Sequence, residues 1–289
     1  MNVASKRHVM IDRRRAACGI AYRVAGDGSA AVFLHGLGSN SRSWLPQLTE
    51  FANSYRVIAW DAPGYGESLD PQTGWRIADY AAALAELVDE LGLVTFHLVG
   101  HSMGGLIAIA FCSERPSRVR SLFLSDTYCG GRARAAQGDP DRVASRLAEF
   151  RSLPRDEFVQ RRVDRLLAPA STGKIREQAA EIMREVRSPA YEIANEALAE
   201  ADLRPVLPGL RVPTTIVCGE FDIVTPPRDA EQIVASVEGA RFIPITGAGH
   251  LSNQEQPALY NRLLRLHLEE TERTIGTPQE KGGDGDGRS

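Results

Sequence analysis

The chain has 289 residues, of which 43% are hydrophobic and 25% are charged, and its formal net charge is −3. This composition is typical of a soluble globular protein, and the charge favours neither nucleic acid nor an anionic membrane as a partner. We expect one large α/β domain that carries an insertion, because such folds often reach this length as a single core.

The N-terminal residues include basic side chains but no apolar run of the length that a secretory signal needs. No segment approaches the roughly 20 apolar residues of a membrane span, so we expect a cytoplasmic protein. The cysteines form no C-x-x-C pair and lie mostly in apolar runs, which is typical of reduced core cysteines. We therefore expect no disulfide framework, no metal and no cofactor.

Apolar β-rich runs alternate with helical segments in the first half of the chain. The runs are GIAYRV, AAVFLHG, YRVIAWD, VTFHLVG and RVRSLFLSD, in this order. Residues 77–91 have apolar side chains at helical spacing, and Gly92 follows as a residue that favours helix C-termini. The alternation predicts a mostly parallel sheet with helices on both faces.

The alternation stops after Asp126, and residues 128–208 contain no convincing strand. Helical periodicity appears within this segment in four stretches, at residues 142–151, 156–167, 175–186 and 191–203. We therefore expect residues 128–208 to form a helical cap that is inserted into the α/β core.

The α/β alternation resumes after the insertion. The expected elements are a strand at 214–220, a helix at 228–237, a strand at 241–245 and a helix at 256–269. The core then comprises residues 1–127 and 209–270. Residues 271–289 are polar and Gly-rich without apolar periodicity, so we expect a disordered tail there.

The segment LVGHSMGGLIAIAF places Ser102 between a strand-like run and a helix-like run. The match to G-x-S-x-G suits a serine on a tight strand-to-helix turn, although such a pattern arises by chance in about one chain in ten of this length. The flanking strand and helix are the context that this turn requires, and the helix N-terminus favours a nearby oxyanion. We predict that Ser102 is a nucleophile; the alternative is a serine that only caps the helix.

A serine nucleophile needs a base within hydrogen-bond reach, and histidine is the usual base. His250 lies in ITGAGHLSNQEQP, a loop that follows the last strand, at the sheet edge where α/β proteins hold ligands. We predict that His250 is the base. We expect no proton transfer from the other histidines, which are His8, His35, His97, His101 and His267.

Two aspartates at strand ends suit the acid that orients this histidine. Asp126 ends LFLSD, and Asp222 lies in IVCGEFDIVTPP, where Thr225 and two prolines shape the loop. We predict Asp222 as the acid. Asp126 stays the alternative, and whichever aspartate is not the acid is expected to hydrogen-bond backbone groups at its strand end.

The glycines of VFLHGLGSNSRSW let the backbone turn inward after a strand. The backbone N–H groups of Leu37 and of Met103, the residue after Ser102, are predicted to form an oxyanion hole. We expect His35 to brace these loops. A phosphate-binding loop is disfavoured, because no G-K-S/T follows and the G-x-G-x-x-G spacing is absent.

Five motifs in this order resemble the α/β-hydrolase fold superfamily: HGLGSN, DAPGYGES, GHSMGG, GEFDIVTP and GAGHLSNQEQP. The resemblance implies a twisted, mostly parallel eight-stranded sheet with a helical cap after the sixth strand. The order Ser102, Asp222, His250 also agrees with the order of the triad in that superfamily.

Within the superfamily, the C-terminal third is most similar to the 3-oxoadipate enol-lactonase group, which opens small anionic lactones. The resemblance implies a serine hydrolase that cleaves a small carboxylic ester or lactone through an acyl-enzyme. The loop DAPGYGES looks more like that of C–C bond hydrolases, and an enamide hydrolase takes its acid from the position of Asp126. The alternatives are therefore a C–C or enamide hydrolase of ring-fission products and a small-molecule receptor or scaffold.

The residues from Arg132 to Arg165 include nine arginines and six acidic residues. A cap arginine that faces the cleft can pair with a substrate carboxylate, and Arg132 and Arg134 are candidates. Solvated helix faces are the competing explanation for this excess. Aromatic side chains that suit a pocket are Trp44, Tyr65 and Tyr128. We expect a small-molecule substrate, which is anionic if such an arginine faces it.

Overall fold

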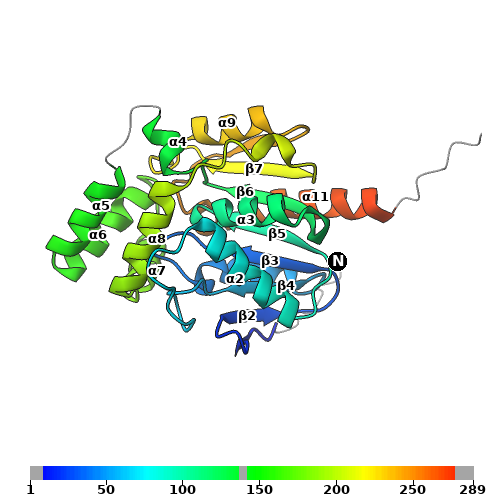
Figure 1. Cartoon of the computed structure of the whole chain (residues 1–289), viewed down its shortest axis with the longest axis horizontal. Coiled ribbons are helices and arrows are strands. Elements are labelled where there is room, and N and C mark those ends of the chain that lie inside the picture. The colour runs from blue at the N-terminus through cyan, green and yellow to red at the C-terminus, as the bar shows by residue number, and fades with distance from the viewer. Residues whose placement is uncertain (1–8, 137–141, 277–289) are drawn as a thin grey trace, which may run out of the picture.

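A computed structural model describes residues 9–136 and 142–276 (Figure 1). One sheet has eight strands in the order β1-β2-β4-β3-β5-β6-β7-β8. The strands are β1 (Asp12–Arg15), β2 (Ala21–Ala25), β3 (Ala30–Leu34), β4 (Arg56–Trp60), β5 (Phe96–His101), β6 (Val119–Ser125), β7 (Thr214–Gly219) and β8 (Arg241–Ile245). Strand β2 is antiparallel to β1 and β4, and the other pairs are parallel. The expected mostly parallel sheet is confirmed.

Strand β1 is the strand that the apolar pattern does not predict. Its sequence is DRRR, and its side chains are half-buried or exposed. It pairs with β2 alone, at the edge of the sheet. A charged edge strand of this kind forms a backbone ladder without a buried face and discourages pairing with another chain.

Helices cover both faces of the sheet. The core helices are α1 (Leu45–Phe51), α2 (Ile77–Glu90), α3 (Met103–Glu114), α9 (Pro227–Ser236), α10 (Ser252–Glu255) and α11 (Pro257–Gly276), with 3₁₀ turns at Ser41–Trp44, Pro116–Arg118 and Leu207–Gly209. Helices α2, α3 and α9 share one hydrophobic cluster, and α1 and α11 share a second. Val32 and Leu34 of β3 join the first cluster and Phe33 joins the second, as the two-residue period of a strand requires.

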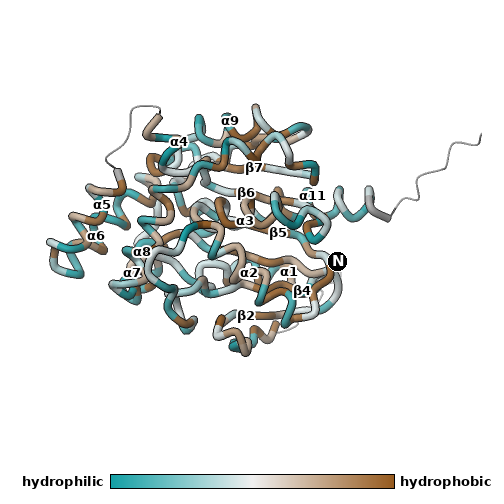
Figure 2. The backbone as a smooth tube through the Cα atoms, in the orientation of Figure 1, coloured by the Kyte–Doolittle hydropathy of each residue, from teal (hydrophilic) through white to brown (hydrophobic). Residues whose placement is uncertain are grey.

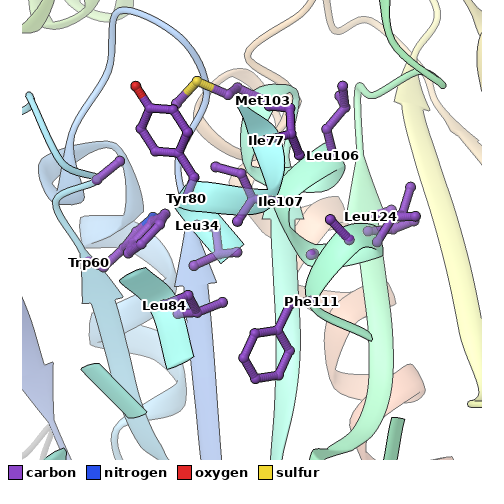
Figure 3. Packing of buried hydrophobic residues seen from close by; sticks show 14 of the residues in the cluster. Leu34, Trp60, Ile77, Tyr80, Leu84, Met103, Leu106, Ile107, Phe111 and Leu124 are labelled. Carbon is purple, nitrogen blue, oxygen red and sulfur yellow. The ribbon is translucent and has the colours of Figure 1, made fainter. Parts of the chain in front are cut away.

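Helix α3 is hydrophobic on all sides, because it is buried between the sheet and α2. Every residue from Met103 to Cys112 is buried, as expected for a helix without a polar face. Figure 2 shows hydrophobic stretches along α3 and the central strands, and Figure 3 shows Leu106 and Phe111 among the side chains packed there. This packing fixes the helix that begins directly after Ser102.

The segment predicted as the cap is helical. It contains α4 (Gly131–Ala135), α5 (Arg142–Ser152), α6 (Arg155–Leu166), α7 (Gly173–Arg184) and α8 (Ser188–Glu200). Its described residues include no strand, and Figure 1 shows α5 to α8 grouped at one end of the sheet. The four expected helices correspond to α5 to α8, and α4 was not expected. The division into a core and a cap at residues 128 and 208 stays a prediction.

The predicted tail is wrong for residues 271–276, which continue α11. Thr271 is buried and donates a hydrogen bond to the carbonyl of His267 at 2.9 Å. Glu272 pairs with Arg120 and His97 of the sheet, each at 2.9 Å. These polar contacts hold the helix where apolar periodicity has ended, and residues 277–289 lie outside the described residues. Within the described ranges, the chain has no helix with both the length and the hydropathy to cross a bilayer.

Because α3 lies so close to the sheet, we predict that adding a side chain at Gly104 destabilises the fold. A Cβ atom there would lie 2.2 Å from the Leu34 carbonyl oxygen. We expect Gly104→Ala to lower the free energy of unfolding in urea by about 1–3 kcal/mol, because the backbones must separate. Gly173→Ala is the control, since no heavy atom lies within 4 Å of a Cβ there. Equal stability of the two variants would contradict this packing argument.

Candidate active site

Ser102 lies on a strained turn between β5 and α3. Its φ is 52° and its ψ is −117°, outside the regions that residues with a side chain prefer. Its N–H donates to the Ser125 carbonyl at 2.9 Å, and its carbonyl accepts from the Gly105 N–H and the Thr127 hydroxyl, each at 2.8 Å. These bonds hold the conformation that presents the Ser102 hydroxyl at the sheet edge.

The His250 imidazole lies between the side chains of Ser102 and Asp222. Its Nε2 atom is 3.0 Å from Ser102 Oγ, and its Nδ1 atom is 2.8 Å from Asp222 Oδ2. Because a carboxylate only accepts, Nδ1 carries the proton and the neutral ring leaves Nε2 as an acceptor for the serine hydroxyl. In this arrangement, the Nε2 atom of His250 can take the hydroxyl proton of Ser102.

Asp222 is held by its own loop. Its Oδ1 atom accepts the N–H groups of Val224 at 2.7 Å and Thr225 at 2.9 Å, and its Oδ2 atom accepts the Thr225 hydroxyl at 2.6 Å. Burial opposes ionisation, but the electrostatic pairing with His250 and the hydrogen bonds from His250 and Thr225 lower the pKa of Asp222 below its usual value. The site therefore contains an ionised carboxylate beside the imidazole.

Asp126 lies near this site but does not contact the imidazole of His250. Its Oδ1 atom accepts the Gly219 N–H at 2.9 Å, and its Oδ2 atom bonds the Ser252 hydroxyl. It is fully buried and has a φ of 49°. Burial and the charge of Asp222 raise the pKa of Asp126 well above its usual value. Asp126 thus connects the end of β7 to the segment that follows His250.

The ligand atoms of Asp126, Cys218 and Asp222 lie within 4.8 Å of one another. The Cys218 thiol approaches the Thr225 carbonyl at 3.2 Å, and both carboxylates accept the hydrogen bonds described above. Burial, followed by the two carboxylates, raises the pKa of the Cys218 thiol above its usual value. A protonated thiol is a poor metal ligand, so this cluster suits a hydrogen-bonded support behind the imidazole better than a metal centre.

The other histidines have structural partners. His101 donates from Nε2 to the His250 carbonyl at 2.7 Å, and burial, followed by the charge of His250, lowers the His101 pKa to about 3. His35 bonds the Gly36 carbonyl at 2.8 Å and accepts the Ala62 N–H at 2.9 Å, so it braces two loops. His97 contacts Ser121, His267 contacts Thr215, and His8 lies outside the described residues. The bond from His101 to the backbone of His250 was not foreseen from the sequence.

The loop of Leu37 lies directly beside Ser102. A Cβ atom at Gly36 would be 3.0 Å from the Ser102 Cβ atom, so the two backbones are in close contact. Met103 is the first residue of α3, and the first N–H groups of a helix have no partner within it. The geometry therefore agrees with backbone donors at Leu37 and Met103, whose role stays a prediction.

A small cavity lies next to these groups. Its volume is about 350 Å³ with the open space at its mouth included, and its walls include Leu37, Gly38, His250 and the cap residues Ile182 and Met183. A wider groove beside it, of about 1090 Å³ by the same measure, shares Ile182 and Gln254. Helix α7 therefore forms one wall of the cavity, and the groove adjoins the cavity at Ile182 and Gln254.

The cap also bonds the loop of His250 directly. The His250 N–H donates to the Leu166 carbonyl at 2.7 Å. The Glu255 carboxylate accepts the N–H groups of Ala168 at 2.8 Å and Gly249 at 2.9 Å, so one side chain holds both segments. The position of the imidazole therefore depends on the end of α6.

The arginine and aromatic side chains that the sequence suggested for the substrate pocket lie in different surroundings. Arg134 pairs with Asp229, donates to the Val224 carbonyl at 2.9 Å and stacks on Tyr128 at 4.1 Å, so it fastens α4 to the loop of Asp222. Arg132 lies on the same short helix and is exposed. Trp44 is fully buried in the core that includes α1 and α11, whereas Tyr65 is buried in the other hydrophobic cluster, with its ring 5.2 Å from that of His35.

The alpha/beta hydrolase family matches residues 31–263 of the chain. The dihydrolipoyllysine-residue acetyltransferase component of the acetoin cleaving system of Cupriavidus necator is 31% identical over 85% of this chain, which spans 65% of that protein's length. The 3-oxoadipate enol-lactonase 2 of Acinetobacter baylyi is 27% identical over 82% of this chain and 88% of its own.

Among solved structures, a thermophilic esterase from Thermogutta terrifontis (malate bound) superposes with a TM-score of 0.78. It is 27% identical, and the match covers 91% of this chain and 99% of the esterase. The family match covers most of the chain and includes the segments of Ser102, Asp222 and His250. The chain therefore belongs to the alpha/beta hydrolase family.

Proposed function

We propose that this protein is a serine hydrolase that cleaves a small carboxylic ester or lactone through an acyl-enzyme, without a cofactor. The observation that carries the proposal is the hydrogen-bonded series from Ser102 through His250 to Asp222, at the edge of the sheet beside the Leu37 loop. Similarity to an enol-lactonase and an esterase supports the same reaction class.

In this mechanism, Ser102 Oγ attacks the carbonyl carbon while His250 Nε2 takes the hydroxyl proton. Asp222 keeps the proton on Nδ1 and stabilises the imidazolium. The Leu37 and Met103 N–H groups hold the tetrahedral oxyanion. Collapse breaks the bond to the leaving oxygen, which receives the proton from His250. Water then attacks the acyl-enzyme with His250 as base, which releases the acid and restores Ser102.

A second candidate is hydrolysis of a C–C or enamide bond in a ring-fission product. The loop DAPGYGES favours it by resemblance, and the same nucleophile, base and oxyanion donors would serve. The bond from His250 to Asp222, and not to Asp126, disfavours the enamide alternative. We favour ester or lactone cleavage over C–C cleavage because of the similarity to an enol-lactonase and an esterase. A cytoplasmic location and a small-molecule partner, with neither nucleic acid nor membrane, stay predictions from the sequence.

Ser102→Ala tests the nucleophile. We expect kcat to fall by roughly 10⁴-fold or more on activated short-chain esters and enol-lactones, because the attacking oxygen is lost. Circular dichroism and thermal melting check that the variant folds, and Ser113→Ala, whose hydroxyl bonds the Ala110 carbonyl within α3, is the control. Turnover near the wild-type rate by Ser102→Ala on every substrate would reject the mechanism.

Paired asparagine variants test the acid. Asp222→Asn is expected to lower kcat by about 10⁴-fold, because an amide that donates to Nδ1 selects the wrong tautomer. Asp126→Asn is expected to lower kcat less than about tenfold, because the raised pKa makes a neutral side chain a close substitute there. If both variants lose the same factor in kcat on one ester, Asp222 is not distinguished as the acid that orients His250.

A further inference from the structure

Within the described residues, four buried polar groups near the oxyanion loop donate no hydrogen bond. They are Nη2 of Arg146 and the hydroxyls of Tyr65, Tyr80 and Tyr191. Arg146 is 8% exposed, and the three tyrosines are at most 2% exposed. Buried donors are satisfied in most folded proteins, so a group of unsatisfied ones needs a physical reason.

These groups come from distant parts of the chain and lie together. Tyr65 follows β4, Tyr80 belongs to α2, Arg146 to α5 and Tyr191 to α8. Burial raises the pKa of Tyr65 well above its usual value; the neighbouring Tyr80 and Tyr191 phenols add to this, and the Gly38 amide and Arg146 oppose it. Tyr65 therefore lies close enough to these core and cap groups for their charges to act on its ionisation.

The position of Arg146 is fixed from the cap side. Its Nε atom donates to the Asn195 side-chain oxygen, and the Asn195 amide donates to the Tyr191 carbonyl at 2.7 Å. The guanidinium is thus held against α8 by one edge. Its Nη2 atom is buried and donates to no group of the described residues.

The cluster flanks both predicted oxyanion donors. Gly38 follows Leu37 and lines the cavity that contains His250, and a Cβ atom at Gly38 would lie 3.6 Å from the Tyr191 ring. Figure 3 shows the Met103 side chain beside the ring of Tyr80. Two of the four groups, Tyr191 and Tyr80, therefore lie beside residues next to or at the predicted oxyanion donors.

Arg146 is also a buried charge without a counterion. In the described ranges no carboxylate pairs with it, whereas the cap arginines Arg134, Arg151 and Arg165 pair with acidic side chains. An uncompensated buried cation is unfavourable, and an anionic ligand removes that cost.

We propose that Arg146 and the hydroxyls of Tyr65, Tyr80 and Tyr191 bind a carboxylate of the substrate. This inference rests on the proposed function and narrows it to esters or lactones that carry an acid group near the reacting carbonyl. All four groups donate, and a carboxylate is an acceptor with up to four lone-pair sites. One guanidinium balances one negative charge, which favours a carboxylate over a phosphate dianion.

Entry of the carboxylate requires a side chain to move. Met183 lines the cavity, and its Sδ and Cε atoms lie against Gly38, next to Tyr191. An unbranched methionine changes rotamer easily and adapts to different occupants. Rotation of Met183 would extend the cavity toward Tyr191 and the rest of the cluster.

The test compares an anionic and a neutral ester of similar length, 4-nitrophenyl hydrogen succinate and 4-nitrophenyl butyrate. We expect wild-type kcat/KM to be about 100-fold higher for the succinate ester, and Arg146→Met to reduce that ratio to near one. Arg151→Met is the matched control, because Arg151 lies on the same helix, is exposed and pairs with Glu192. It should retain the wild-type ratio.

Tyr65→Phe is the second variant, because it removes one unsatisfied donor without adding volume. We expect the ratio of kcat/KM for the succinate ester to that for the butyrate ester to fall, mainly because KM for the succinate ester rises, and we expect no fall in Tm. A wild-type ratio near one, or a ratio that Arg146→Met leaves unchanged, overturns the proposal.

A binding measurement separates this inference from the proposed function. Hydrolysis of neither ester by the wild-type protein counts against the hydrolase mechanism. The carboxylate site is then judged by the rise in Tm with succinate and with its neutral analogue succinamide. A rise with succinate alone that is lost in Arg146→Met supports the site, and equal shifts with both compounds contradict it.

Discussion

The site depends on a single strained residue that the core holds in place. Ser102 has a positive φ, and such a conformation persists only where the surrounding packing determines it. Helix α3 provides that packing, because it is buried on every side and its glycine at position 104 lets it approach β3. The position of Ser102 is therefore a property of the whole core, and loops alone would not maintain it.

The two buried carboxylates after β6 and β7, Asp126 and Asp222, differ in protonation state because their surroundings differ. Asp222 accepts hydrogen bonds from two backbone N–H groups and one hydroxyl, and these bonds favour its ionised form beside His250. Asp126 is fully buried near that charge, which favours its protonated form. Neighbouring groups of one type thus differ in protonation, because repulsion disfavours two adjacent charges. One carboxylate can orient the imidazole while the other holds the backbone around it.

Most of the fold and part of the site were predictable from the sequence. The strands and the flanking helices follow from apolar periodicity, and the turn at Ser102 has a local signature. Chain order and the residues of its loop favoured Asp222 as the acid, but they did not exclude Asp126, because both aspartates follow strands that are adjacent in the sheet. The bonds of Thr225 and Ser252 separate them, and these depend on side-chain directions.

Long-range polar contacts were the least predictable features. The extension of α11 past residue 270 rests on Glu272 reaching Arg120, 152 positions away in sequence. The cluster of Arg146 and the tyrosines likewise joins four separate elements, and no spacing rule connects them. The arginine excess drew attention to the cap, but it did not distinguish Arg146, which is buried and has no carboxylate partner among the described residues.

The bonds between the His250 loop and the end of α6 have a consequence for how such enzymes diversify. The carbonyl of Leu166 and the carboxylate of Glu255 join the inserted helices to the loop that carries the imidazole. Grafting a foreign cap at the chain positions where the insertion begins and ends would sever these bonds. A transplanted cap therefore has to provide a backbone acceptor for the His250 N–H. The unit that must be exchanged together thus includes contacts of the His250 loop, which lies outside the inserted segment of the chain.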